Sequence, residues 1–303
     1  MQHNVKREEC NMNITITGNL GSGKSTVCKE LKADGYTIIS TGDIFREIAA
    51  KQGLSVVELN QKVEQEIKQG KHDIDDMIDN RSHELGNLYS DAVFDSRLAW
   101  HFVEKSFKVF LITDITEAAK RVLNAGRETE KFDSLEECRA GLLKRQFLEQ
   151  SRFTELYGID YYDMSNYNLI LETTAATPEQ IKKEILSQLV QYENGDFTQR
   201  ILLNPTSVYP TQASGERSDD EGTDNGKTVT VGLKSNEWYA LDGQQSVLSA
   251  IANKETFLCV EVEHDACIPE ISEEFVRDFE AKGQFIYRKY PSGKEEMNLL
   301  HFL

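Results

Sequence analysis

Eight residues near the start of the chain have the types and spacing needed to hold a chain of phosphates. They read Gly18-Asn19-Leu20-Gly21-Ser22-Gly23-Lys24-Ser25 and fit the pattern G-x-x-x-x-G-K-[ST]. Glycines allow a tight turn that directs N–H groups at phosphate oxygens, a lysine reaches the terminal phosphates, and the serine hydroxyl can bind Mg²⁺. The stretch predicts a P-loop that binds a nucleoside triphosphate and Mg²⁺ through Gly18, Gly21, Ser22, Gly23, Lys24, Ser25 and the next residue, Thr26.

The neighbouring sequence supports this prediction. Residues 13–17 form a short β-branched run typical of a buried strand, and Val27, Cys28 and Leu31 follow the loop at helical spacing. A strand, a glycine loop and a helix are the context that a P-loop requires, whereas a glycine turn that matches by accident would not need it. The motif indicates only that a nucleoside triphosphate is bound, so the acceptor has to be inferred from other residues.

Four further apolar runs alternate with helical patterns along the first two thirds of the chain. We expect strands at residues 36–40, 92–94, 108–112 and 168–171, with helices between them and a last helix opened by Pro178. This alternation predicts a five-stranded parallel sheet covered on both faces. Ligands bind at the carboxyl ends of such strands, where the P-loop, Ser40, Asp95 and Arg97 should converge.

Asp95 and Arg97 follow the third expected strand and have distinct predicted roles. An acidic group after a strand of a P-loop protein can bind the metal or its water, so Asp95 joins Ser25 as a candidate metal ligand. Arg97 is suited to a bidentate contact with a phosphate. The alternatives are a turn aspartate and a solvated arginine.

A long expected helix, with a capping box at Ser134 and Glu137, carries Arg145, Glu149 and Arg152 on one face. These residues predict either a solvated face with a salt bridge or a lid whose arginines stabilise the transferring phosphoryl group. Arg121 and Arg127 precede the helix and could serve in the same way.

Composition restricts the class of protein. The 303 residues contain 39% hydrophobic residues, and none of the apolar runs approaches the roughly 18 residues of a membrane span. With a net charge of −17, a nucleic acid or an anionic membrane is not an expected partner. The polar N-terminus has no apolar signal core, which predicts a cytoplasmic protein, and the five irregularly spaced cysteines predict isolated thiols.

Several of these segments together resemble the cytidylate kinase family, particularly its short, archaeal-like branch, over residues 12–192. The resemblance rests on the P-loop, Ser40-Thr41-Gly42-Asp43-Ile44-Phe45-Arg46, Asp95-Ser96-Arg97-Leu98-Ala99-Trp100, Arg145-x-x-x-Glu149-x-x-Arg152 and Tyr157-Gly158-Ile159-Asp160-Tyr161. It implies catalytic roles for Lys24, Arg97, Arg145 and Arg152, and contacts with a nucleoside monophosphate from Ser40, Arg46, Arg97 and Arg152.

Two features depart from that family's pattern. Asp95-Ser96 replaces the more usual Glu-Gly pair before Arg97, and Glu149 stands where many members have Asp. The segment that binds the monophosphate is short, so either Asp75 or Asp79 is a candidate for the acidic residue near the nucleobase.

The last third of the chain has a different character. A polar stretch near residue 195 divides residues 1–194 from a small α+β domain at 195–303, in which we expect a disordered acidic loop near 212–227. Strands are expected at 228–231, 238–241 and 257–262, and helices at 244–253 and 272–282. Trp238-Tyr239-Ala240-Leu241-Asp242-Gly243 faintly resembles ParB-like and sulfiredoxin-like domains, but Gln244, Gln245 and Ser246 replace that family's two histidines and arginine, so we expect no catalysis there.

The sequence therefore predicts an α/β P-loop kinase with a five-stranded parallel sheet, a helical lid and a small C-terminal domain. The leading hypothesis is ATP-dependent phosphorylation of CMP or dCMP. One alternative is a kinase of another small acceptor. The other is a nucleotide-binding regulator that acts through the C-terminal domain, by way of a protein partner or self-association.

Overall fold

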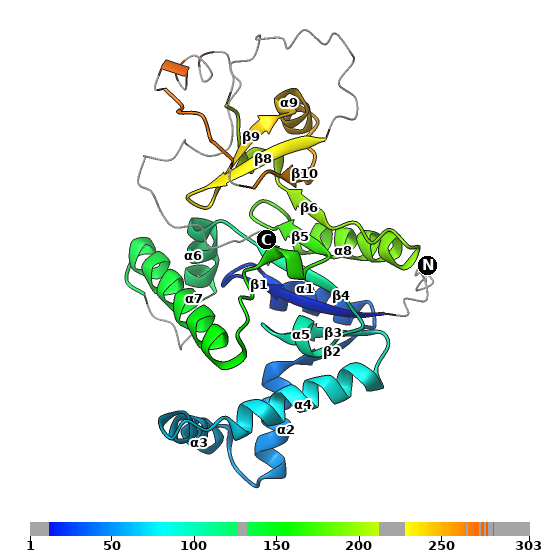
Figure 1. Ribbon diagram of the computed structural model, residues 1–303, viewed down its shortest axis with the longest axis vertical. Helices are drawn as coiled ribbons and strands as arrows, with labels where there is room; N and C mark the ends of the chain where they lie inside the picture. Colours follow the sequence, from blue (N-terminus) through cyan, green and yellow to red (C-terminus); the bar gives the residue numbers. More distant parts are fainter. Residues whose placement is uncertain are drawn as a thin grey trace. The chain divides into compact units, whose positions relative to one another are not determined.

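A computed structural model describes residues 12–125, 132–211, 228–264, 266–272, 274–275, 277 and 281 (Figure 1). The chain forms two compact units, and the chain passes between them more than once. The first contains the chain up to Leu111 with Asn166–Leu169 and Pro178–Thr198, and the second contains Ile112–Ser165, Ile170–Thr177 and the chain from Gln199. These units therefore divide the fold differently from the boundary expected near residue 195, which stays a prediction.

The sheet of the first unit contains four parallel strands in the order β2-β3-β1-β4. All six residues of β1 are buried, as expected for a central strand with both faces covered. In the register of the sheet, Asp95 lies beside Ile16 on one side and Ser40 on the other. The four strands are β1 (Asn13–Gly18), β2 (Thr37–Ser40), β3 (Ala92–Asp95) and β4 (Ser106–Ile112).

The fifth expected strand is β5 (Leu169–Glu172). The amide of Asn168 donates to the carbonyl of Lys108 at 2.8 Å, and the amide of Thr173 donates to the carbonyl of Ile112 at 2.7 Å. Because both partners advance along the chain together, β5 runs parallel to β4. The expected parallel α/β sheet is confirmed.

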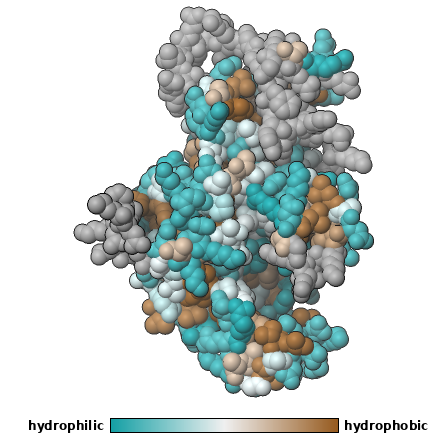
Figure 2. Space-filling model, turned by 180° about the vertical axis from the view of Figure 1, so that it is seen from behind, coloured by the Kyte–Doolittle hydropathy of each residue, from teal (hydrophilic) through white to brown (hydrophobic). Residues whose placement is uncertain are grey.

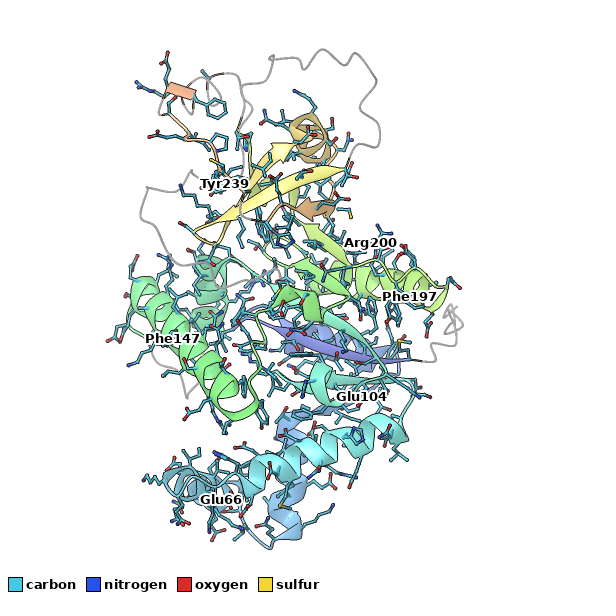
Figure 3. The ribbon with its side chains drawn as sticks, viewed as in Figure 1. Glu66, Glu104, Phe147, Phe197, Arg200 and Tyr239 are labelled. Carbon is cyan, nitrogen blue, oxygen red and sulfur yellow. The ribbon has the colours of Figure 1, made fainter. Side chains whose placement is uncertain are left out.

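Six helices lie in the described residues of the first unit. Two of them begin with capping boxes, in which Ser40 caps α2 and Ser55 caps α3 through the third residue of each helix. Glu66, near the end of α3 and labelled in Figure 3, accepts a hydrogen bond from the Ile74 amide at 3.1 Å. This bond satisfies a backbone N–H group in the first turn of α4. The helices are α1 (Lys24–Ala33), α2 (Thr41–Lys51), α3 (Val56–Lys68), α4 (Asp73–Leu88), α5 (Ala99–Phe102) and α8 (Pro178–Glu193).

The surface of this unit mixes charged residues with exposed apolar ones. Figure 2 shows brown, apolar residues near the bottom of the view, and Figure 1 shows α3 at the same level. Val57 and Ile67 of α3 are 65% and 45% exposed. No helix in the described part of the chain combines the length and the hydropathy that a membrane span requires.

The second unit holds a helical pair and a second set of strands. Helix α6 (Ile115–Asn124) packs against α7 (Leu135–Tyr157), which ends at Gly158 in a left-handed conformation. Strands follow one another in the order β5-β6-β10-β8-β9-β7, with both parallel and antiparallel pairs. Their bounds are β6 (Arg200–Leu203), β7 (Val208–Tyr209), β8 (Val229–Lys234), β9 (Glu237–Asp242) and β10 (Leu258–Val262), with helix α9 (Gln244–Ala252) and the 3-10 helices η1 (Met164–Asn166) and η2 (Pro205–Ser207).

Most element expectations match the structure, with small shifts at the ends. The strand, Asp242-Gly243 turn and helix expected in the last third appear as β9, Gly243 and α9. Strands β6 and β7 and helix α5 were not expected. Outside the described residues lie the acidic loop at 212–227, Arg127, the N-terminal residues 1–11 and part of the helix expected at 272–282.

Candidate active site

The P-loop joins β1 to α1 in the first unit, and its glycines are required by its geometry. A Cβ atom at Gly18 would collide with the carbonyl oxygen of Leu111, so a larger residue cannot occupy this position. Gly23 has a φ of 87° and precedes α1 with no side-chain cap on the helix. Because the N-cap residue is a glycine, it contributes no side-chain acceptor, and the start of α1 is suited to an anion that accepts from backbone N–H groups.

Ser25 and Asp95 come together at the first turn of α1. The Ser25 hydroxyl donates to Oδ2 of Asp95 at 3.3 Å, although the residues are 70 positions apart in sequence. Mg²⁺ in phosphotransferases is held by one or two protein oxygens, with substrate phosphates and waters completing its shell. A hydroxyl beside a carboxylate fits that requirement. Among the described residues, no cluster of three or more His, Cys, Asp and Glu side chains forms an all-protein metal site.

Arg97 is held at the beginning of the P-loop. Its Nη1 donates to the carbonyl oxygen of Gly18. The hydroxyl of Thr17, the last residue before Gly18, donates to the carbonyl oxygen of Ser96 at 3.1 Å and lies 3.3 Å from that of Arg97. Sequence reasoning had missed Thr17, although a hydroxyl in a fully buried strand is a signal of such a contact. The segment after β3 is thus fixed to the end of β1.

The charges around α1 act on the Cys28 thiol. Burial raises the pKa of Cys28 far above its usual value, the Asp95 carboxylate raises it further, and the Lys24 ammonium opposes both. Cys28 is 4% exposed. Lys24 is the first residue of α1 and Asp95 contacts Ser25 next to it, so a lysine and a carboxylate both lie at the first turn of the helix, as a metal–phosphate complex requires.

Ser40 and Arg46 are joined through Asp43 at the start of α2. The Ser40 hydroxyl donates to Oδ2 of Asp43 at 2.6 Å, and Nη2 of Arg46 donates to Oδ1 at 2.6 Å. The hydrogen bond from Ser40 lowers the pKa of Asp43, burial opposes this, and Arg46 lowers the pKa as well. The structure thus brings together two of the four residues expected to contact a monophosphate, and Ser40 lies beside Asp95 in the sheet.

The lid candidates lie on α7 in the second unit. Nε of Arg145 and Oε1 of Glu149 form a salt bridge at 3.1 Å, one helical turn apart. Arg152 is exposed on the same helix. Gln150 of α7 also donates to both oxygens of Asp160, at 2.9 and 3.0 Å, which fixes the Tyr157–Tyr161 segment to the helix. The catalytic roles of Arg145 and Arg152 stay predictions.

Arg121 has a different role from the one the sequence suggested. Its Nη2 donates to the carbonyl oxygens of Thr173 and Thr174 at 2.7 and 3.0 Å, and its Nε donates to Glu117 at 3.1 Å. A guanidinium would have to give up these bonds to bind a phosphate. Arg121 therefore fixes α6 to the segment after β5.

The two nucleobase candidates both lie on α4. Asp75 is 3.9 Å from Nδ1 of His72 at the beginning of the helix, and Asp79 lies one turn further along. The choice between them stays open.

The comparisons with known proteins agree with this geometry. The model of the cytidylate kinase-like family matches residues 13–175. The chain belongs to the cytidylate kinase-like family. As a member of this family the chain is a phosphotransferase, and the matched residues include the P-loop, Asp95, Arg97 and α7.

Two curated relatives and a solved structure each match more than half of the chain. A cytidylate kinase of Thermoplasma volcanium is 32% identical over 197 residues, covering 63% of this chain and 98% of the relative. A cytidylate kinase of Methanothrix thermoacetophila is 37% identical over 164 residues, 54% of this chain and 88% of the relative. A shikimate kinase structure from Bacteroides thetaiotaomicron covers 60% of this chain and 97% of its own, at 17% identity and a TM-score of 0.39.

Proposed function

We propose that the protein is an ATP-dependent nucleoside monophosphate kinase that converts CMP or dCMP to the diphosphate. The observation that carries the proposal is the contact between Ser25 and Asp95 at the P-loop, with Arg97 held at Gly18. A protein that only sensed nucleotides could lose several of the charged groups used in phosphoryl transfer, whereas this chain retains Lys24, Arg97, Arg145 and Arg152 together with Ser25. The names of the relatives support CMP as the acceptor.

The proposed reaction needs no protein nucleophile. An oxygen of the acceptor phosphate attacks the γ-phosphorus of ATP, the bond to the β–γ bridging oxygen breaks, and ADP leaves with its electrons. Mg²⁺ would be held by Ser25 and Asp95, and when bound it neutralises charge on the β- and γ-phosphates. Lys24 supplies a second positive charge at these phosphates, and Arg97 holds the acceptor phosphate with its fork of N–H donors.

The arginines of α7 would complete the charge stabilisation. In the structure Arg145 is paired with Glu149, so it must exchange this carboxylate for a phosphate when nucleotides bind. Arg152 carries a second positive charge on the same helix. Because phosphate offers a doubly charged partner, the exchange becomes favourable only when nucleotide is present.

Binding of the acceptor tests the proposal. Isothermal titration of CMP, dCMP, UMP, AMP and shikimate, in the presence of Mg²⁺ and a non-hydrolysable ATP analogue, should show the tightest binding for CMP or dCMP. Arg46→Lys keeps the charge but loses the planar fork, so it should weaken binding of CMP and leave binding of the ATP analogue unchanged. Preferential binding of shikimate would favour a kinase of another small acceptor.

The proposal places the enzyme in the cytoplasm, where its nucleotide substrates are found. The net charge of −17 disfavours nucleic acid as a partner, and the bound nucleotides would depend on the local lysine and arginines.

A further inference from the structure

The buried carboxylate of Glu172, in the second unit, accepts hydrogen bonds from residues before and after residue 175, where the family match ends. Glu172, the last residue of β5, is 3% exposed. Its Oε1 accepts hydrogen bonds from the hydroxyls of Thr174 and Ser207, both at 2.6 Å, and its Oε2 accepts one from the Asn204 amide at 2.9 Å. Thr174 lies within the matched residues, whereas Asn204 and Ser207 lie beyond them.

The Thr174 hydroxyl continues this network toward the helical pair. It donates to Glu172 and accepts from the Asp114 amide at 3.0 Å, and Asp114 caps the start of α6. Arg121 from the far end of α6 donates to the carbonyl oxygens of Thr173 and Thr174. Both ends of α6 are therefore bonded to the two residues that follow Glu172.

The network also extends into the last third of the chain. Strand β6, which begins at the labelled Arg200 in Figure 3, leads to Asn204. The Asn204 side chain donates to the Thr256 carbonyl oxygen at 3.3 Å, and Thr256 lies just before β10. Asn204 and Ser207 are 5% and 2% exposed, so water does not readily replace these bonds.

We propose that Glu172 is a positioning residue through which the C-terminal domain holds helix α6, and with it the lid helix α7. A buried carboxylate needs several donors. Here one donor is Thr174, on the segment that is bonded to α6, and the other two, Asn204 and Ser207, come from the C-terminal side. Since α6 packs directly against α7, loosening of α6 is passed to the helix that carries Arg145 and Arg152. The assignment of α7 as a lid rests on the proposed function, but the connection from Ser207 to α6 does not.

This inference gives the C-terminal domain a role that requires no chemistry of its own. The domain would act as a fixed support for the lid and not as a second active site. That agrees with Gln244, Gln245 and Ser246 standing where the resembled family has histidines and arginine. It also predicts that changes at Ser207, far along the chain from the P-loop, alter kinase kinetics.

Hydrogen exchange on the full chain, without nucleotide, tests the connection directly. Ser207→Ala removes one donor on the C-terminal side, and we expect amide exchange in α6 to become about tenfold faster, a change typical of losing a hydrogen bond to a charged group. Thr174→Val should have the same effect, whereas Thr174→Ser keeps the hydroxyl and should restore slow exchange. Exchange in α1, in the other unit, serves as an internal reference. Ser249→Ala, at an exposed position of α9, is the matched control and should leave α6 unchanged.

Kinetics separate positioning from general loss of stability. In Ser207→Ala we expect kcat to fall several-fold, while the KM for the monophosphate stays within twofold, and Thr174→Ser should behave like the wild type. Exchange in α6 that is the same in Ser207→Ala, Thr174→Val and the wild type would overturn the inference. If the wild type phosphorylates no monophosphate but α6 still responds, only the proposed function fails.

Discussion

The hydroxyl of Ser25 lies 3.3 Å from Oδ2 of Asp95, which joins the first turn of the P-loop helix to the end of β3. The sequence predicts both residues as ligands of Mg²⁺. Their contact brings together a motif that is local in sequence and a carboxylate that is not. It is also the contact whose removal gives the clearest change in metal dependence.

Changes at Ser25 should alter the requirement for Mg²⁺. Loss of a residue that merely supports a metal ligand typically costs about 10–100-fold in metal affinity or activity, so loss of a direct ligand should cost at least as much. Ser25→Ala should therefore raise the Mg²⁺ concentration for half-maximal turnover at least about tenfold. Ser25→Thr keeps the hydroxyl and is the control. An unchanged Mg²⁺ titration in folded Ser25→Ala would remove Ser25 from the metal site.

Arg97→Lys should harm catalysis although the charge is kept. An ammonium cannot make a bidentate contact with a phosphate, and it also cannot reproduce the guanidinium contact with the Gly18 carbonyl oxygen. We expect a loss of about 1.5–3 kcal/mol in kcat/KM for the monophosphate, the range for hydrogen bonds to charged groups. Steady-state kinetics with either substrate varied will check this. Equal effects on KM for ATP and for the monophosphate would argue against an acceptor role.

The sequence predicted those parts of the fold that are specified locally. Gly18 to Ser25 has a fixed spacing, Ser134 at the start of α7 is followed by an acid three residues later, and the runs around Val93 and Val109 are apolar. Such signals require only neighbouring residues. Strand β7 was missed because two residues are too few to show a period.

The contacts that the sequence did not reveal join distant segments. Glu172 looked like the end of a strand, and its partners Asn204 and Ser207 follow 32 and 35 residues later. Arg121 was a candidate phosphate ligand in the sequence analysis. Its contacts with the Thr173 and Thr174 carbonyl oxygens become visible only in the folded chain. In both cases the residue type was informative, but the partner that determines its role depends on tertiary structure.

The start of α2 should show a pH-dependent stability. The pKa of Asp43 is lowered in the folded protein, so its contribution is present above the usual carboxyl pKa of about 4 and is lost as the pH falls through the lower folded value. Asp43→Asn should therefore be less stable than the wild type at pH 7, and the difference should shrink in acid. Urea unfolding at a series of pH values measures this.

Ser40 provides a second test of the same cap. Ser40→Ala removes the hydroxyl that bonds Asp43 and should cost about 1 kcal/mol at pH 7, as for other N-cap residues. Ser40→Thr should retain the wild-type pH profile. A difference between the wild type and Asp43→Asn that is constant from pH 7 into acid would contradict the lowered pKa.

Cys28 should be unreactive in the native protein. Because burial raises its thiol pKa, the reactive thiolate is scarce throughout the range from pH 7 to 9. Iodoacetamide at pH 8 should modify the exposed Cys259 and Cys267 and leave the peptide containing Cys28 unmodified, until the chain is denatured. Rapid native modification of Cys28 would show that the first turn of α1 is open.

The most direct test of the account is a coupled assay of ADP release by the full chain, with ATP, Mg²⁺ and CMP, dCMP, UMP, AMP or shikimate as the acceptor. We predict turnover with CMP or dCMP and a kcat/KM at least about tenfold below that value with AMP and shikimate. Lys24→Ala should remain folded and lose turnover by on the order of 100- to 1,000-fold, the cost of removing one donor that stabilises transition-state charge. ADP release that no nucleoside monophosphate stimulates, or near-normal turnover by folded Lys24→Ala, would contradict the central claim.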